Sequence, residues 1–278
     1  MKMKMVITAC MALALSSCAG EFNKVFKSQD YDYRYEFAKQ CFAQGKYGQA
    51  VTLLQDMVTV MKGHNGGDNA QESLYMLAMA EYMSGDYESA AQTFRKYTTS
   101  YPKGIYVEKA SFYVGESLYE SAPEPRLDQS PTNGAINAYQ QFLDLFPDSE
   151  LRPEAQRKLF ELQDKLIMKE YLNAKLYFNL GGYFGNINDN NESNYTACII
   201  TAQNALKYYP FTSLREDFSL LIMKSKFQLA ENSSEEKLID RYRDAEDECY
   251  GFINEFPDSK NKELAERYIA KCKKVVGD

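Results

Sequence analysis

Residues 78–102 of the chain read AMAEYMSGDYESAAQTFRKYTTSYP, and the pattern in this stretch decides the fold. Apolar residues recur three and four positions apart on both sides of Gly85, which is the spacing of two amphipathic helices joined at a glycine. Proline cannot continue a helix and restricts the residue before it, so the second helix is predicted to end at Tyr101-Pro102. We therefore expect a helical hairpin here.

The same signals recur along the chain. Gly45-Lys46-Tyr47 returns 40 residues later as Gly85-Asp86-Tyr87. An aromatic residue followed by proline occurs at Tyr101-Pro102, Phe146-Pro147, Tyr209-Pro210 and Phe256-Pro257. Twelve positions before each proline stands a small residue, which lets two helices approach closely: Ala90, Ala135, Cys198 and Ala245.

This spacing resembles the tetratricopeptide repeat, a helix pair of about 34 residues. We expect an all-α fold, a right-handed α-solenoid of five tetratricopeptide-like helical hairpins plus a C-terminal capping helix over residues 260–275. The last helix would cover the apolar face that a stack of hairpins leaves at its end. Residues 31–150 would form repeats one to three, and residues 151–278 would form repeats four and five with the cap.

Two local signals mark expected helix starts. Ser130-Pro131 offers a capping serine followed by proline at the first helical position. Ser213 and Glu216 have the spacing of a capping box. The fourth repeat carries an Asn-rich insertion, Asn186 to Asn194, whose role the sequence leaves open.

The first residues indicate a secreted lipoprotein. Residues 1–17 read as a signal peptide, with Lys2 and Lys4 ahead of an apolar run that is too short to span a bilayer of about 30 Å. The run ends in Leu15-Ser16-Ser17-Cys18, which looks like a bacterial lipobox. We expect the thiol of Cys18 to carry a diacylglyceryl group with acyl chains such as palmitate, residues 18–30 being a lipidated tether.

The alternative for this segment is an ordinary secretory leader without lipid. Ala19 follows the cysteine, and it is not the aspartate that retains many lipoproteins at the inner membrane. We therefore expect anchoring to the outer membrane of a Gram-negative bacterium, on its periplasmic face.

Cysteines beyond the leader are scattered as Cys41, Cys198, Cys249 and Cys272, which matches no zinc motif. Cys249 and Cys272 are the best candidates for a disulfide, but their distances from the turn at Pro257 differ by about 7.5 Å along the helix axes. We favour four buried thiols.

The first helices of four repeats each carry two aromatic residues seven positions apart, on one helix face. The two aromatics and the position four residues after the first of them form a row along that helix face. We interpret it as the concave, peptide-binding face of the repeats, because rings bury much area at low entropic cost. The eight candidates are Tyr35, Phe42, Tyr75, Tyr82, Phe112, Tyr119, Tyr171 and Phe178.

Composition argues against an enzyme. The 278 residues include one histidine, His64, and carry a net charge of −7, which disfavours nucleic acid as a partner. Gly181 to Gly185 contains glycines but no phosphate-binding signature. We expect no catalytic residue, no metal, no cofactor other than the lipid, and no small-molecule substrate.

Lipobox, length and repeats together resemble the BamD family, lipoproteins of the outer-membrane β-barrel assembly machinery. The resemblance implies a non-enzymatic scaffold. Its N-terminal repeats would recognise unfolded outer-membrane proteins through C-terminal aromatic signals, and its C-terminal repeats would dock on the barrel-forming subunit. The alternatives are a periplasmic envelope-coordination adaptor and a SusD-type glycan-binding lipoprotein. The second class is about twice as long and uses tryptophan, which this chain lacks.

Overall fold

The computed structural model describes residues 20–61, 67–181 and 193–277. The signal peptide, Cys18, His64 and residues 186–192 of the Asn-rich insertion lie outside the described residues. The described part is helical and contains no strand. Beyond a helical segment at residues 20–26, its helices are α2 (Tyr31–Ala43), α3 (Tyr47–Met61), α4 (Gly67–Met83), α5 (Tyr87–Ser100), α6 (Val107–Glu120), α7 (Ser130–Leu145), α8 (Arg152–Leu180), α9 (Asn194–Tyr208), α10 (Arg215–Glu231), α11 (Glu235–Glu255) and α12 (Lys262–Val276).

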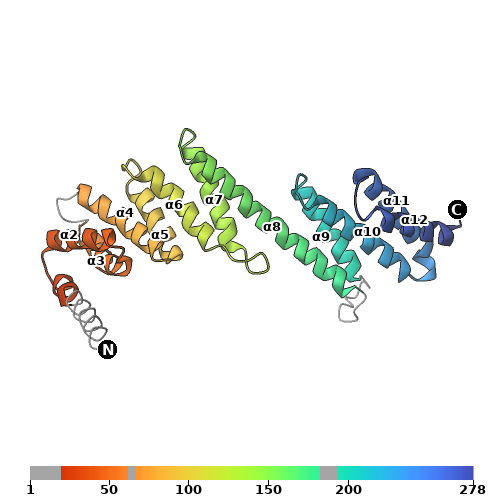
Figure 1. Ribbon diagram of the computed structural model, residues 1–278, viewed down its shortest axis with the longest axis horizontal. Coiled ribbons are helices and arrows are strands. Elements are labelled where there is room, and N and C mark those ends of the chain that lie inside the picture. Colours follow the sequence, from red (N-terminus) through yellow and green to blue (C-terminus); the bar gives the residue numbers. More distant parts are fainter. Residues whose placement is uncertain (1–19, 62–66, 182–192, 278) are drawn as a thin grey trace, which may run out of the picture. The chain divides into compact units, whose positions relative to one another are not determined.

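Consecutive helices pack in pairs, as the repeat predicts. The pairs are α2 with α3, α4 with α5, α6 with α7, α8 with α9 and α10 with α11, and α12 packs on α11 (Figure 1). The final covering helix, α12, lies where the sequence predicted a capping helix. The prediction of an all-α chain of five hairpins and a capping helix is confirmed.

The second helices of four pairs end in the same way. Tyr101, Phe146, Tyr209 and Phe256 are the C-cap residues of α5, α7, α9 and α11, with φ between −125° and −131° and ψ of 65° or 66°. Each cap N–H donates to the carbonyl four residues back. The following proline excludes the α conformation from the cap residue, so the helix stops there.

Glycine closes the first two hairpins. Gly45 and Gly85 have φ of 71° and 85°, in the left-handed region that residues with a Cβ rarely adopt. Glycine recurs at these positions because the turn between the two helices requires a positive φ.

The two expected helix starts are wrong in detail. The N-cap of α7 is Gln129, and Ser130 is already helical. α10 begins at Arg215 without a side-chain cap, and Glu216 instead accepts a hydrogen bond from the hydroxyl of Ser259 at 2.6 Å. A contact 43 residues away in the sequence thus replaces the predicted capping box.

The described residues form two compact units. The first comprises residues up to Pro123 together with Gln129–Leu162, and the second comprises Glu124–Asp128 together with residues from Gln163 onward. The division thus falls inside α8, whereas the sequence placed a boundary before it. The functional division between residues 31–150 and 151–278 stays a prediction.

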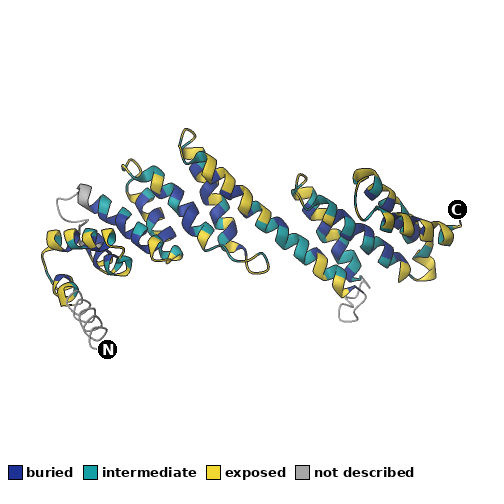
Figure 2. Ribbon diagram, in the orientation of Figure 1, coloured by how far each residue is buried: buried dark blue, intermediate teal, exposed yellow. Residues whose placement is uncertain are grey.

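Each unit has its own apolar cores, built from neighbouring helices. In the first unit they join α2 to α6 and then α6 to the start of α8. In the second they join the end of α8 to α10 and then α10 to α12. Buried residues face the neighbouring helices, and exposed residues face away (Figure 2). Such local cores are typical of repeat proteins.

The four described cysteines are buried thiols, and none forms a disulfide. Burial raises the pKa of Cys249 to about 12 and that of Cys272 to about 11. The preference for buried thiols over a disulfide is confirmed.

Gly115 in α6 provides a test of the helix packing. A Cβ at Gly115 would meet the ring of Tyr139 on α7 at 2.7 Å. We expect Gly115→Ala to lower the free energy of unfolding by about 1–3 kcal/mol, because the close-packed interface cannot widen freely. Urea denaturation followed by the helical circular dichroism signal measures this.

Gly134→Ala is the matched control, because a Cβ there would lie at an ordinary 3.6 Å from Leu118. It should leave stability unchanged or raise it by up to about 1 kcal/mol, since alanine favours helix. Equal losses in both variants would contradict the packing argument.

Candidate functional site

A pocket of about 300 Å³ lies between the first two hairpins, within the first unit. α2 and α4 are the first helices of these hairpins, and spacings of three and four residues place their side chains on one face. We call this pocket between the first two hairpins the aromatic pocket. Its lining residues are Lys39 and Phe42 on α2, Glu72, Tyr75, Met76 and Met79 on α4, and Tyr106 at the N-cap of α6.

Tyr75 is held by other rings. It stacks on Tyr106 with centroids 4.4 Å apart and planes at 13°, and it makes edge contacts with Phe94 and Tyr97. Burial raises the pKa of Tyr75, with smaller contributions from neighbouring tyrosines, so the hydroxyl stays neutral at ordinary pH. The pocket wall is therefore fixed and uncharged at this point.

Two charged side chains border the apolar lining. Lys39 lies 5.1 Å from the centroid of the Tyr35 ring, and its ammonium donates to Glu36 at 3.3 Å. Burial of the Tyr35 ring raises the pKa of its hydroxyl, and Glu72, which lies beside that hydroxyl, raises this pKa further. The pocket suits an apolar or aromatic side chain with a polar group next to it.

Two of the eight predicted rings belong to the core. Tyr35 is 4% exposed and Phe112 is 5% exposed. Phe112 makes edge contacts with Tyr139 and Phe142 of the second helix of its hairpin. These two rings pack between helices, and we leave them out of the candidate site.

Three other predicted rings are half-buried but lie outside the aromatic pocket. Tyr82 contacts Tyr87 and Tyr113 edge-on. In the second unit, Tyr171 contacts Phe218 and Phe178 contacts Tyr195. Of the eight candidates, Phe42 and Tyr75 are the ones that the structure brings together in a pocket.

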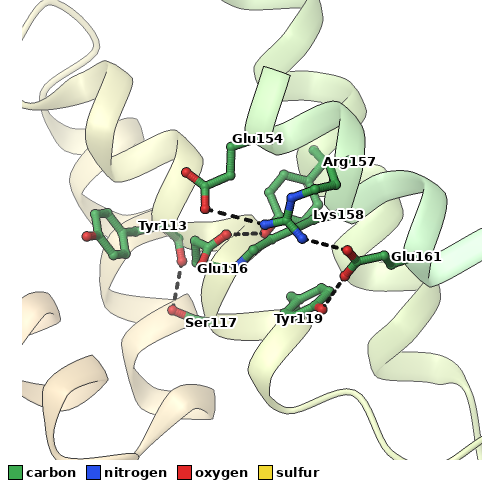
Figure 3. Close-up of polar contacts among 9 residues, drawn as sticks. Tyr113, Glu116, Ser117, Tyr119, Glu154, Arg157, Lys158 and Glu161 are labelled. Atoms are coloured by element: carbon green, nitrogen blue, oxygen red, sulfur yellow. Dashed lines mark hydrogen bonds and ion pairs between the residues drawn. The ribbon is translucent and has the colours of Figure 1, made fainter. Parts of the chain in front are cut away.

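Tyr119 belongs to a network of charges between α6 and α8 (Figure 3). Its hydroxyl donates to Glu161 at 2.5 Å, which raises its pKa to about 12, and the Lys158 ammonium lies 4.4 Å from its ring centroid. Lys158 also donates to Glu116 at 2.5 Å, and both side chains are nearly buried. Glu116 accepts a second hydrogen bond from Tyr139, also at 2.5 Å.

Sequence reasoning missed part of the pocket. Lys39 and Met79 lie on the predicted row, four positions after Tyr35 and Tyr75, but neither is aromatic, which was the signal that the prediction used. Tyr106 gave no signal, because it precedes α6 and enters the pocket only through its stacking on Tyr75.

Two features are absent from the part of the chain that the structure describes. No helix there combines the length and the apolar character needed to cross a bilayer. No group of three or more His, Cys, Asp or Glu side chains there is arranged to hold a metal ion.

The fold is that of a helical-repeat protein, and the aromatic pocket is one of its surface features. Residues 28–192 match the model of the YfiO family, described as outer membrane lipoprotein. This match covers more than half of the chain, and the chain belongs to that family.

One relative is the outer membrane protein assembly factor BamD of Caulobacter vibrioides, which is 21% identical over 179 residues. The alignment covers 63% of this chain and 58% of that protein, so the chain spans less than two thirds of the relative's length. A crystal structure of nearly identical TPR-like repeats, from a Podosopora anserina kinesin light chain, aligns at 11% identity with a TM-score of 0.33. That alignment covers 81% of this chain and 95% of the other.

The buried ion pair between Glu116 and Lys158 gives the second prediction. Lys158→Ala leaves a buried carboxylate without its cation, and we expect the free energy of unfolding to fall by about 3–5 kcal/mol. Arg157→Ala, one position earlier, removes exposed pairs with Glu154 and Glu161 and should give little or no measurable change. Urea denaturation of both variants measures the difference, and similar losses would contradict it.

Proposed function

We propose that the chain is a non-catalytic, lipid-anchored scaffold that helps to insert β-barrel proteins into the outer membrane. Its membership of an outer membrane lipoprotein family supports this, and so does the name of its relative, an outer membrane protein assembly factor. The observation that carries the proposal is the aromatic pocket, because unfolded barrel proteins expose aromatic and apolar side chains in extended segments.

In this proposal the aromatic pocket binds the C-terminal aromatic signal of an unfolded barrel protein. The ring of the signal enters between Phe42, Tyr75 and Met79, and Lys39 pairs with a carboxylate of the bound segment. Rings fixed by stacking lose little entropy on binding, which favours recognition.

The second unit docks on the barrel-forming subunit. This docking is supported by two exposed aromatic residues where α9 ends and the turn to α10 follows. Tyr208 is 73% exposed and Phe211 is 99% exposed. Large exposed apolar side chains on a folded protein often mark an interaction surface.

Met79→Glu tests the pocket. A carboxylate in the apolar lining would lose its hydration when a ring binds, so we expect at least about a tenfold loss of affinity. The measurement is fluorescence anisotropy of a labelled peptide with the last strand of a barrel protein.

Met83→Glu is the matched control, one turn along α4, because Met83 is 48% exposed and does not line the pocket. It should bind the peptide within about twofold of the unchanged chain, and both variants should still bind the barrel-forming subunit, since the second unit is untouched. Equal peptide binding by both variants would refute the assignment of the pocket.

The lipid anchor is tested at Cys18. We expect the protein extracted from membranes to carry an N-terminal cysteine whose intact mass includes a diacylglyceryl group and an acyl chain. Cys18→Ala should abolish binding of the purified chain to lipid vesicles that lack the barrel-forming subunit, because no other part of the proposal attaches it to lipid. A mature N-terminus without acyl modification would refute the anchor and leave the peptide assay unaffected.

A further inference from the structure

A second pocket, of about 490 Å³, lies at the turns that precede α6 and α8, in the first unit. We call it the turn pocket. Its apolar lining comes from Ile105, Phe146 and Leu151, and its acidic lining from Glu108, Asp148 and Glu150. The aromatic pocket has a different lining, although Tyr106, which borders it, follows Ile105 directly.

Hydrogen bonds build a frame around the turn pocket. The Ser149 hydroxyl donates to Glu108 at 2.6 Å and accepts from the N–H of Leu151 at 3.1 Å. These bonds join the turn before α8 to the first turn of α6.

The second unit contains a copy of this frame. The Ser259 hydroxyl donates to Glu216 at 2.6 Å and accepts from the N–H of Asn261 at 3.0 Å. Both copies follow the sequence Phe-Pro-Asp-Ser. Residues that differ between the two copies are therefore not required for the hydrogen bonds of the frame.

The side chains around the two frames differ. Where the first frame has Ile105, Glu150 and Leu151, the corresponding positions of the second frame hold Ser213, Lys260 and Asn261. Because the second frame forms without them, Ile105, Glu150 and Leu151 are not needed to build it.

The turn pocket leaves apolar surface and negative charge uncovered. Ile105 is 79% exposed. Asp148 and Glu150 are exposed, and neither has an ion-pair partner among the described residues. Lys109 is the one cation in the lining, against three acids. This combination complements a chain in which lysine or arginine stands next to an apolar residue.

We infer that the turn pocket is the docking site for an extended segment of another protein, with an apolar side chain flanked by lysine or arginine. The apolar side chain covers Ile105 and Leu151. The stems of the basic residues lie along the apolar lining, and their charged ends reach Asp148 and Glu150. The inference rests on residues outside the aromatic pocket and holds independently of the proposed function.

The probe is a fluorescent peptide with alternating lysine and leucine, compared with the same peptide carrying glutamate or serine in place of one residue type. Anisotropy with the full chain should show binding of the Lys-Leu peptide. The Glu-Leu and Lys-Ser peptides should bind at least about tenfold more weakly, because each lacks one of the two interactions.

The test variant is Ile105→Ser with Glu150→Lys, which gives the turn pocket the residues that the second frame carries and still folds with. It should reduce affinity for the Lys-Leu peptide at least about tenfold. Asp258→Lys is the matched control, because it makes the same change in charge at an exposed position of the second frame. It should bind the peptide within about twofold of the unchanged chain.

Several results would overturn the inference. Equal losses in the test variant and in Asp258→Lys would mean that the peptide follows net charge alone. Failure of the Lys-Leu peptide to bind, or equal binding of the Glu-Leu peptide, would exclude a basic partner. Self-association that the test variant abolishes, seen by sedimentation, would assign the pocket to a second copy of this chain. Vesicle binding that the test variant abolishes would assign it to lipid.

Discussion

The structure depends on a small buried side chain at each place where the two helices of a hairpin meet. The first helices supply Ala38, Ala78, Gly115, Ala174 and Ser225, and the second helices supply Ala50, Ala90, Ala135, Cys198 and Ala245, all of them buried. Helix axes approach to about 8–10 Å only where such side chains permit it. This close approach fixes the pairs, and the larger apolar residues fill the spaces around them.

Charge is buried where the third hairpin meets α8. The pair between Glu116 and Lys158 brings two ions out of water, and such a pair stabilises a fold only when further hydrogen bonds complete it. The hydroxyl of Tyr139 supplies that bond to Glu116. The same network occupies Tyr119, since Lys158 lies over its ring and Glu161 accepts from its hydroxyl. A ring that the sequence assigned to binding therefore has a structural role.

The turn at residues 104–106, before α6, borders both pockets. The side chain of Gln71 accepts hydrogen bonds from the Tyr97 hydroxyl at 2.6 Å and from the N–H of Ile105 at 3.0 Å. Gly104 leaves room for this contact, because a Cβ there would lie 2.1 Å from the Gln71 oxygen. The turn is thus held in place, with Ile105 in one pocket and Tyr106 in the other. Surfaces fixed in this way lose little entropy when a partner binds.

The sequence by itself determined the helices, their pairing and the residues at which the second helices of four hairpins end. These features rest on local physics: proline after an aromatic residue stops a helix, Gly45 and Gly85 adopt positive φ, and small residues recur at fixed spacing. The sequence also placed Phe42 and Tyr75 on one face of their helices. The rows of aromatics carry no information on burial, because that depends on the neighbouring hairpin.

Only the tertiary structure decided which rings remain accessible. Tyr35 and Phe112 occupy the same positions in the repeat as Tyr75, yet they are almost fully buried. Tyr106 reaches its pocket by stacking on a residue 31 positions earlier, and Lys158 pairs with a carboxylate 42 positions earlier. The spacing of residues within one helix cannot encode such contacts, because they arise where separate hairpins meet.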